Sequence, residues 1–398
     1  MSLSMTMLKN SARLLVSVVL LAVLPMQQAT AQMMDTKAPS AILLDASTGA
    51  VLFEKNADEP FEPASMSKLM TVYLAFEAIK QGAYTLDSEA IVSDNVWRQF
   101  VRDTSSSKMM LNAGDVVTME QLLKGIIVSS GNDATVALAE FMAGSEQTFV
   151  EWMNIKAEEL GMKNSHFKNT HGLPAEGHLM SARDLSILAL HLVNDFPELY
   201  SFFKETEFTY GIDINTGLPI TQKNRLPVLY NLEGADGLKT GHTNASGYAL
   251  TASAVRDGRR LVLVFTGLSS ARERASEAAR LLEYGFRNFQ TYKLFSAGEK
   301  VEEANVWLGE NSKINLIAAE DVVMTLSRAE RARMDVIVKY NSPIPAPIAA
   351  GQSLATANIM IPNREAVVVP LVAEKAVEDI GGFAKLGAAF KYILFGSS

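Results

Sequence analysis

The sequence predicts an α+β fold, in which an antiparallel sheet is flanked by helices and a second, small all-β domain follows. Three observations carry this prediction. Strand-like segments stand towards both ends of residues 32–289, and helical segments fill the middle. Two pairs of those strands are joined by short turns of small or polar residues, which is typical of antiparallel hairpins. From about Gln290 onward, the segments become short and β-like.

The first half of residues 32–289 opens with a hairpin and continues with helices. Residues 41–45 and 51–54 flank Ser47-Thr48-Gly49-Ala50 and predict the hairpin. Residues 65–80 are apolar on most sides and are followed by Gly82, which predicts a largely buried helix. Thr118 and Gln121 have the spacing of a capping box and predict a helix that runs into Val128.

The second half continues with helices and closes with another hairpin. Further helices are expected at residues 134–142, 146–160, 183–193 and 276–284. Ser181 is the expected N-cap of the third of these helices. Two strands, residues 249–255 and 261–266, flank Arg256-Asp257-Gly258-Arg259, which is a second hairpin signal.

Residues 290–373 are expected to form the small all-β domain. Turns rich in Gly, Asn and Pro separate several of its strands, including Ser342-Pro343-Ile344-Pro345-Ala346-Pro347. The segment contains no histidine and no obvious catalytic grouping, so we expect the chemistry in residues 32–289. Strands are predicted at residues 301–307, 314–317, 322–326, 336–340 and 367–371.

Residues 1–31 have the pattern of a secretory signal peptide. Lys9 and Arg13 form a positive start, an apolar run covers residues 14–24, and Ala29-Thr30-Ala31 provides a cleavage pattern. A membrane-spanning anchor is the alternative, but the apolar run is short of the roughly 20 residues that a bilayer requires. We therefore expect a mature chain that starts near Gln32, outside the cytoplasm.

Residues 374–398 are expected to form an amphipathic membrane-anchoring helix. A Gly381-Gly382 hinge precedes most of the segment, and apolar residues then recur at steps of mostly three and four. Phe395 breaks the stripe, and a helix of this kind could instead dock on the body of the protein. The stripe indicates a helix lying at a membrane surface. Its members are Ile380, Phe383, Leu386, Phe390, Ile393 and Leu394.

Composition and charge exclude several classes of function. The formal net charge is −8, and the leader contributes Lys9 and Arg13, so the mature chain is more acidic still and is a poor ligand for nucleic acid. The absence of cysteine excludes disulfides and thiolate catalysis. The histidines show no HExxH spacing, and His171 and His178 lie in one loop without a third ligand nearby in sequence. We expect no metal and no cofactor, and a structural or substrate-lining role for these two histidines.

The first motif with chemical meaning is Ser65-Met66-Ser67-Lys68, at the start of the buried helix. A serine and a lysine three apart lie on the same helical face, one turn removed. A serine hydroxyl becomes a good nucleophile when a base takes its proton, and a lysine can be that base if its pKa is lowered. Alone, the pattern is a weak signal, because it is far more often an ordinary solvated helix start.

Two further motifs add polar groups. Ser130-Gly131-Asn132, at the junction of two predicted helices, offers a hydroxyl to relay a proton and an amide to hold a substrate carbonyl. Lys239-Thr240-Gly241, ahead of the second hairpin, offers a cation and a hydroxyl for an anionic group and a glycine for close approach. Each alone has an ordinary reading, a turn in one case and a solvated edge-strand lysine in the other.

In combination and order, the three motifs resemble those of the penicillin-binding-protein and serine β-lactamase superfamily. The surrounding residues 63–71, 129–134 and 236–243 are similar to the low-molecular-mass D-alanyl-D-alanine carboxypeptidases. The likeness extends to Asn169-Thr170-His171-Gly172-Leu173 and Gly285-Phe286, and it covers effectively the whole chain. It implies a β-lactamase/transpeptidase-like fold and a serine peptidase that trims the terminal D-alanine from peptidoglycan pentapeptides.

The resemblance also implies roles for the motif residues. Ser65 would attack the D-Ala-D-Ala carbonyl and form an acyl-enzyme, with Lys68 as its base. Ser130 would pass a proton to the leaving amine, and Asn132 would hold the substrate or orient Lys68. Backbone N–H groups of Ser65 and His242 would form the oxyanion hole. The other expected binding residues are Lys239, Thr240, Gly241, Arg274 and, as a looser match, Arg225.

The resemblance also leads to expectations for the pKa of Lys68 and for the cellular location of the protein. Desolvation and the positive charge of Lys239 are expected to lower the pKa of Lys68. The chain is expected to cross the bacterial inner membrane and to lie, as a peripheral protein, on its periplasmic face. Its expected partners are peptidoglycan pentapeptides, β-lactams and, through the C-terminal helix, the membrane surface; the sequence names no protein partner.

Two alternatives stay open at this point. A β-lactamase would share the fold, but the Glu-x-x-Leu-Asn pattern of class A enzymes does not occur. A non-catalytic penicillin-sensing or wall-binding protein would keep the fold without the reaction, although no catalytic position is missing.

Overall fold

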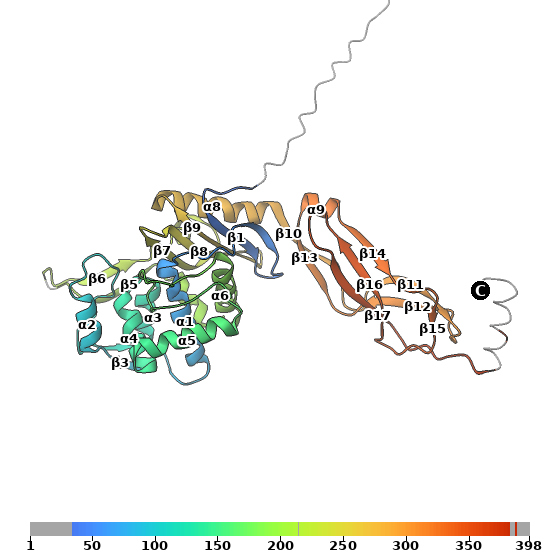
Figure 1. The fold of residues 1–398 in the computed structure, drawn as a ribbon, viewed down its shortest axis with the longest axis horizontal. Coiled ribbons are helices and arrows are strands. Elements are labelled where there is room, and N and C mark those ends of the chain that lie inside the picture. The colour runs from blue at the N-terminus through green and yellow to red at the C-terminus, as the bar shows by residue number, and fades with distance from the viewer. Residues whose placement is uncertain (1–33, 214, 383–386, 388–398) are drawn as a thin grey trace, which may run out of the picture. The chain divides into compact units, whose positions relative to one another are not determined.

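The computed structural model describes residues 34–213, 215–382 and 387. Contacts divide the chain into Met1–Asp35 and Thr36–Ser398, and the following description concerns the second unit. Its centre is a five-stranded sheet in the order β2-β1-β9-β8-β7, with antiparallel neighbours throughout (Figure 1). The strands are β1 (Ser40–Asp45), β2 (Val51–Lys55), β7 (Ala235–Thr243), β8 (Gly247–Arg256) and β9 (Arg259–Leu268).

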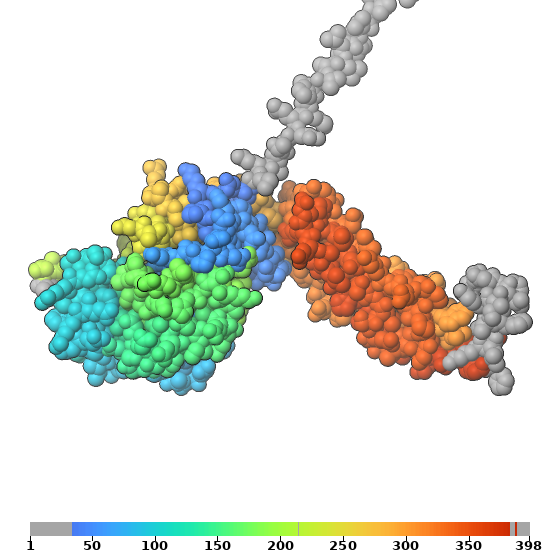
Figure 2. Space-filling model, viewed as in Figure 1, coloured from blue at the N-terminus to red at the C-terminus, as the bar shows by residue number. Residues whose placement is uncertain are grey.

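Both predicted hairpins are present in this sheet, as β1–β2 and β8–β9. The sheet also contains a pairing that no turn signal indicates, because β1 lies beside β9 with Ser40 opposite Thr266. The amino-terminal strands, blue in Figure 2, therefore lie against the yellow and gold segments that follow residue 235. The α+β prediction, with an antiparallel sheet, is confirmed.

Helices cover both faces of the sheet. Helix α8 (Ala271–Asn288) lies along one face and α6 (Ala182–Asp195) lies on the other (Figure 1). Buried side chains of the helical layer include Phe76 and Phe149. The layer contains the 3₁₀ turn η1 (Ala64–Ser67), α1 (Lys68–Lys80), α3 (Met119–Ile127), α4 (Asn132–Ala143) and α5 (Glu146–Glu159).

The helix boundaries follow from capping residues, as predicted for two of them. Thr118 accepts a hydrogen bond from the Gln121 backbone N–H, and the Gln121 side chain accepts one from the Thr118 N–H, which completes a capping box. Ser181 caps α6 by accepting from the Asp184 N–H. The predicted helix 65–80 is present, but its first turn is the 3₁₀ turn η1 rather than α-helix.

Several short elements were not predicted, because their apolar patterns cover only one or two turns or a few alternations. Helix α2 illustrates this, since it has seven residues and only Val96 and Phe100 are buried. These elements are β3 (Glu89–Ile91), α2 (Asp94–Phe100), β4 (Val116–Thr118), η2 (Leu199–Lys204), β5 (Glu207–Ile212), β6 (Pro219–Lys223) and α7 (Val228–Asn231).

The carboxy-terminal part is rich in strands and has its own apolar core, as predicted. Strand β10 (Phe289–Phe295) pairs with β13 (Val322–Ser327), and α9 (Arg328–Ala332) follows it. A six-stranded sheet has the order β14-β16-β17-β12-β11-β15. Its strands are β11 (Lys300–Trp307), β12 (Lys313–Ala318), β14 (Asp335–Lys339), β15 (Ile344–Pro345), β16 (Ser353–Met360) and β17 (Val367–Ala373).

The two ends of the chain lie largely outside the described residues. The predicted leader, residues 1–31, and residues 383–386 and 388–398 of the predicted tail helix fall there. The helix predicted from residue 374 is wrong over residues 374–381, which are not helical because Val377 pairs with Ile348 and Asp379 with Gly309. Among the residues that the structure describes, no helix is both long enough and apolar enough to cross a bilayer. The predicted domain boundaries at residues 31, 289 and 373 stay predictions.

The capping box of α3 gives a testable stability effect. Thr118→Ala removes the hydroxyl that accepts the Gln121 N–H and should lower the free energy of unfolding by about 1 kcal/mol. Thr118→Ser keeps the hydroxyl and should stay close to the parent. Urea unfolding at constant m-value measures both, and equal midpoints for Thr118→Ala and Thr118→Ser would contradict the capping role.

Candidate active site

Ser65 and Lys68 of the first motif meet Asn132 of the second motif at the start of α1. Lys68 is fully buried, and its Nζ donates to Ser65 Oγ at 3.0 Å. The same ammonium donates to Asn132 Oδ1 at 2.6 Å and to the His171 carbonyl oxygen at 2.5 Å. All three of its N–H donors thus face oxygen acceptors, one on η1, one on α4 and one in the loop before α6.

The environment of Lys68 lowers its pKa to about 7. Burial is the main cause, the positive charge of Arg225 adds to it, and the negative charge of Asp133 opposes it. The sequence-based expectation named Lys239 as the lowering charge, and Arg225 takes that place in the structure. Near neutral pH, a substantial fraction of Lys68 is therefore unprotonated and able to accept a proton from Ser65.

The second motif forms the junction between α3 and α4, as predicted. Ser130 has a positive φ of 59°, and its Oγ accepts a hydrogen bond from Lys239 Nζ at 2.9 Å. Gly131 is required by close packing, because a Cβ there would lie 2.9 Å from the Met109 backbone nitrogen. Asn132 begins α4, which points its side chain towards Lys68. The junction therefore presents a hydroxyl and an amide to the same space.

The third motif lies on β7, at the edge of the five-stranded sheet. Lys239 is buried, and its burial together with the charge of Lys68 lowers its pKa well below the usual value. Gly241 lets β7 approach η1, because a Cβ there would lie 2.9 Å from the Pro63 carbonyl oxygen. The sequence assigned this glycine to substrate approach, and the structure adds a packing reason within the protein itself.

Two arginines, Arg274 and Arg225, lie near the two buried lysines and add positive charge to the site. The Arg274 side chain comes from α8, is buried, and places its guanidinium 5.5 Å from the centre of the Tyr248 ring. Burial lowers the pKa of Arg274 to about 10, so it stays charged at neutral pH. Arg225 donates to Ser107 Oγ at 2.7 Å and to the Ser129 carbonyl oxygen at 2.5 Å.

These groups surround a cavity of about 560 Å³. Eight predicted site residues line it: Ser65, Ser130, Asn132, Arg225, Thr240, Gly241, His242 and Arg274. The other two predicted residues, Lys68 and Lys239, lie behind the two serines that they contact. Sequence reasoning missed six lining residues. They are Ser105, Ser106, Ser107, Leu173, Tyr248 and Ala271.

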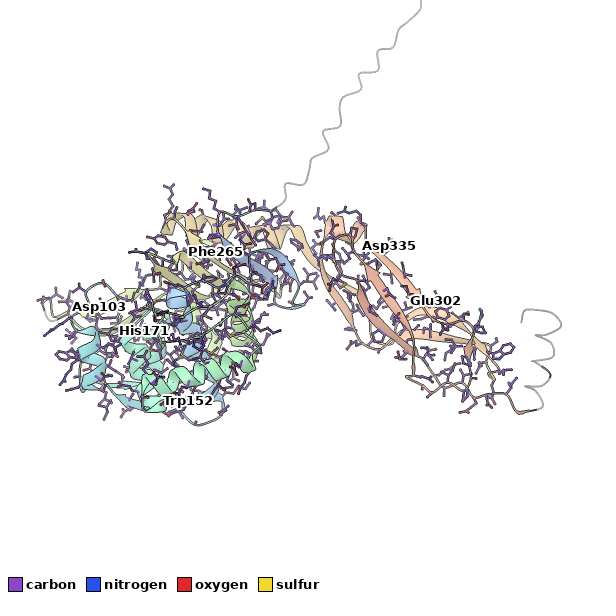
Figure 3. All side chains as sticks on the ribbon, in the orientation of Figure 1. Asp103, Trp152, His171, Phe265, Glu302 and Asp335 are labelled. Atoms are coloured by element: carbon purple, nitrogen blue, oxygen red, sulfur yellow. The ribbon has the colours of Figure 1, made fainter. Side chains whose placement is uncertain are left out.

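Some of these six residues have a recognisable pattern in the sequence, and others have none. The run Ser105-Ser106-Ser107 is visible in the sequence as three adjacent hydroxyls, but only the fold brings it to the cavity. Asp103, labelled in Figure 3, holds the beginning of this run by accepting from the Ser105 and Ser106 N–H groups. Tyr248 carries no local signal, and it reaches the site because it pairs with His242 across β7 and β8.

His171, labelled in Figure 3, and His178 are both buried in the loop that precedes α6. Burial and the nearby charge of Lys68 lower the pKa of His171 to about 3, so its ring is neutral. Its Nδ1 accepts a hydrogen bond from the Leu173 N–H at 3.1 Å. The ring therefore shapes the loop whose carbonyl oxygen contacts Lys68, which agrees with the structural role expected for it.

Two models of known protein families match this chain. A family model described as D-alanyl-D-alanine carboxypeptidase matches residues 26–300, and one described as penicillin-binding protein 5, C-terminal domain, matches residues 289–379. The chain belongs to the D-alanyl-D-alanine carboxypeptidase family. The prediction of a serine-type carboxypeptidase of the low-molecular-mass penicillin-binding proteins is thereby confirmed.

Named relatives are similar over most of their length. D-alanyl-D-alanine carboxypeptidase DacC of Escherichia coli K12 is 36% identical over 87% of this chain and 85% of its own. Penicillin-binding protein 5 from Haemophilus influenzae superposes with a TM-score of 0.73 at 33% identity, covering 87% of this chain and 99% of that one. The DacD structure from Francisella tularensis gives a TM-score of 0.77 at 30% identity, covering 87% and 95%.

The packing of Gly241 against η1 is directly testable. Gly241→Ala should lower the free energy of unfolding by roughly 1–3 kcal/mol, because the added methyl overlaps the Pro63 carbonyl oxygen. Gly381→Ala is the matched control, since a Cβ at Gly381 would meet no atom within 4 Å. Thermal or urea unfolding compares the two, and equal stability of both variants would show that β7 does not need a glycine here.

Proposed function

We propose that this carboxypeptidase removes the terminal D-alanine from peptidoglycan pentapeptides through an acyl-enzyme on Ser65. The observation that carries the proposal is the hydrogen bond from the buried Lys68 to Ser65 at the wall of the cavity. Lys68 accepts the Ser65 proton as Ser65 Oγ attacks the peptide carbonyl carbon. Asn132 holds Lys68 in place through the 2.6 Å contact.

The tetrahedral intermediate is stabilised by backbone dipoles. The Ser65 and His242 N–H groups donate to the oxyanion. Ser130 then gives its proton to the amine of the leaving D-alanine and takes up the proton held by Lys68, so that the C–N bond breaks and the acyl group stays on Ser65. Water hydrolyses this ester and releases the shortened peptide. Lys239 supports the proton transfer, because its Nζ contacts Ser130 Oγ at 2.9 Å.

The terminal carboxylate of the substrate binds among the cations. Thr240 and Arg274 line the cavity, and Lys239 lies behind Ser130. Arg225 is the second arginine of this wall and contributes positive charge there. β-Lactams carry a carboxylate and a reactive amide carbonyl and bind in the same place. A relative from Listeria monocytogenes, penicillin-binding protein D2, has been solved in an ampicillin-bound form with a TM-score of 0.54 at 26% identity.

The test combines D-alanine release with acylation of the serine. The parent enzyme should release D-alanine from a pentapeptide, and benzylpenicillin should add to Ser65 alone, as located by mass spectrometry. Ser65→Ala should lose both reactions. An adduct on any other residue would contradict the assignment of the nucleophile. Rapid loss of the penicilloyl group would indicate a β-lactamase instead, and labelling without D-alanine release would indicate a sensor.

The base role of Lys68 predicts a pH dependence. Because only neutral Lys68 accepts a proton and its pKa is about 7, single-turnover acylation should rise with pH through about 7 and level off above it. Lys68→Arg keeps the charge but holds its proton, so acylation should fall by on the order of 10²–10⁴ or more. Near-normal acylation by Lys68→Arg would exclude lysine as the base.

The variant Lys239→Ala serves as a comparison for Lys68→Arg. It removes a cation from the carboxylate-binding wall and leaves Lys68 with Ser65, so slow acylation should persist and binding should weaken. Acylation followed at saturating benzylpenicillin separates the two variants. An equal loss in both would show that Lys239 acts in proton transfer as strongly as Lys68.

The proposal extends to the place of the enzyme. Residues 1–31 direct the chain across the bacterial inner membrane, and residues 374–398 hold it on the periplasmic surface of that membrane as a peripheral protein. The first part is supported by the leader, in which a positively charged start, an apolar run and a small-residue cleavage pattern follow one another. The second part is supported by the apolar stripe that begins at Ile380.

Deletion of the tail tests the anchor. A chain that ends before Gly381 should release D-alanine at the parent rate and stay in the supernatant when membranes are sedimented. The full chain should sediment with them. A truncated enzyme that still sediments would contradict an anchoring role for residues 381–398.

A further inference from the structure

His178 is a buried histidine that the proposed mechanism does not use, and its ring lies two contacts away from the nucleophile's peptide. It is 2% exposed, and its Nε2 lies 2.7 Å from Ser67 Oγ. On the other side of the ring, the Lys168 backbone N–H donates to Nδ1 at 3.2 Å. Because Nδ1 accepts, the proton of the neutral ring is on Nε2, and the ring donates to Ser67.

The neutral form is the one present at working pH. Burial lowers the pKa of His178 to about 4, and the nearby charges of Lys68 and Lys168 and the neighbouring His166 act in the same direction. The donor to Ser67 Oγ is therefore retained throughout the pH range in which Lys68 can act as a base.

Ser67 connects His178 to Ala64, the residue before the nucleophile. With its oxygen accepting from His178, the Ser67 hydroxyl donates to the Ala64 carbonyl oxygen at 3.1 Å. Ala64 has a positive φ of 50°, a strained conformation for an alanine, which persists only where its surroundings hold it. Gly172 packs against the same carbonyl, since a Cβ there would lie 1.8 Å from the Ala64 oxygen.

The Ala64 carbonyl and the Ser65 N–H belong to one peptide unit, which is planar. A contact that holds the carbonyl oxygen therefore also sets the direction of the N–H, which lies in the same plane and points the opposite way. In the proposed function, this N–H is one of the two oxyanion donors, and such donors act through their preset direction.

We propose that His178, acting through Ser67, is a positioning residue that orients the Ala64–Ser65 peptide so that the Ser65 N–H points to the forming oxyanion. This inference rests on the proposed function, because it requires an acyl-enzyme on Ser65. It assigns a purpose to the second serine of Ser65-Met66-Ser67-Lys68 and to the strained conformation of Ala64.

Two substitutions of His178 separate its two contacts. His178→Gln places an amide where Nε2 lies and can still donate to Ser67 Oγ. His178→Asn places an amide oxygen where Nδ1 lies, so it can accept from the Lys168 N–H but does not reach Ser67. His166→Gln is the matched control, because His166 lies in the same loop with an exposed side chain.

Single-turnover acylation of the full chain by benzylpenicillin measures the effect. His178→Asn should acylate on the order of 10-fold to 100-fold more slowly at saturation, with unchanged affinity in the preceding binding step, because only the direction of an oxyanion donor changes. His178→Gln should restore the rate, and His166→Gln should match the parent. Parent-like acylation by His178→Asn would overturn the inference, as would an equal loss in His178→Gln.

Infrared spectroscopy of the acyl-enzyme reads the oxyanion hole directly. The ester carbonyl of the penicilloyl group on Ser65 should absorb at higher frequency in His178→Asn than in the parent, because it receives a weaker hydrogen bond. In His178→Gln the band should return to the parent position. A mere change in stability would leave the band in place, so an unshifted band in His178→Asn would overturn the inference.

Ser67→Ala provides an independent route if the histidine variants fold poorly. It removes the hydroxyl that contacts the Ala64 carbonyl, and it should shift the band and slow acylation as His178→Asn does. The double variant should be no slower than either single one, and multiplying effects would overturn a shared relay. A parent enzyme without an adduct on Ser65 would contradict the proposed function itself, whereas parent-like variants contradict only the role of His178.

Discussion

The site depends on how one buried ammonium group is held. Lys68 contacts oxygen atoms of Ser65, Asn132 and His171, which come from three separate parts of the chain. A buried cation without such acceptors would be very unfavourable, so these contacts and the fold around them require one another. Burial and the charge of Arg225 nevertheless lower the pKa of Lys68 to about 7, so near neutral pH its charged and neutral forms have similar free energies. A base that can both take and return a proton results from this balance.

The elements that carry these acceptors are themselves held by buried polar contacts. Glu146, in the first turn of α5, accepts hydrogen bonds from both the N–H and the hydroxyl of Thr170, beside His171. The Asp133 carboxylate accepts from the backbone N–H groups of Met109, Met110 and Leu111. One carboxylate thus positions the loop before α6, and the other positions the segment that follows the serine run.

The charge of the cavity wall is opposite to that of the whole chain. The chain has a net charge of −8, yet Lys68, Lys239, Arg225 and Arg274 surround a single cavity. Their mutual repulsion and their burial lower the pKa of each lysine. A carboxylate bound among them would oppose both effects and favour the charged form of Lys239. Substrate binding and the protonation state of the site are therefore coupled.

Sequence reasoning succeeded where the information is local. The hairpins β1–β2 and β8–β9, the caps Thr118 and Ser181 and the three motifs all depend on residues close together in the chain. It failed where the information is spatial, as for the β1–β9 pairing and for the effect of the Arg225 charge on the pKa of Lys68. Strand β16 was missed because its sequence, SLATANIM, is rich in alanine and has few β-branched residues. The His171 contribution comes from a backbone carbonyl, which no side-chain pattern can reveal.

The pairing of β1 with β9 also determines the order in which the molecule can be assembled. Strand β1 lies between β2, to which a short hairpin turn joins it, and β9, in which Thr266 is the partner of Ser40. Until the chain has emerged as far as β9, one edge of β1 has no strand to pair with, and η1 has no β7 to pack against. Such long-range closure makes folding slow, because loop entropy is lost before the contacts form. The cavity around the nucleophile is therefore complete only after more than half of the polypeptide has been made, because β7, β8 and α8 supply part of its lining.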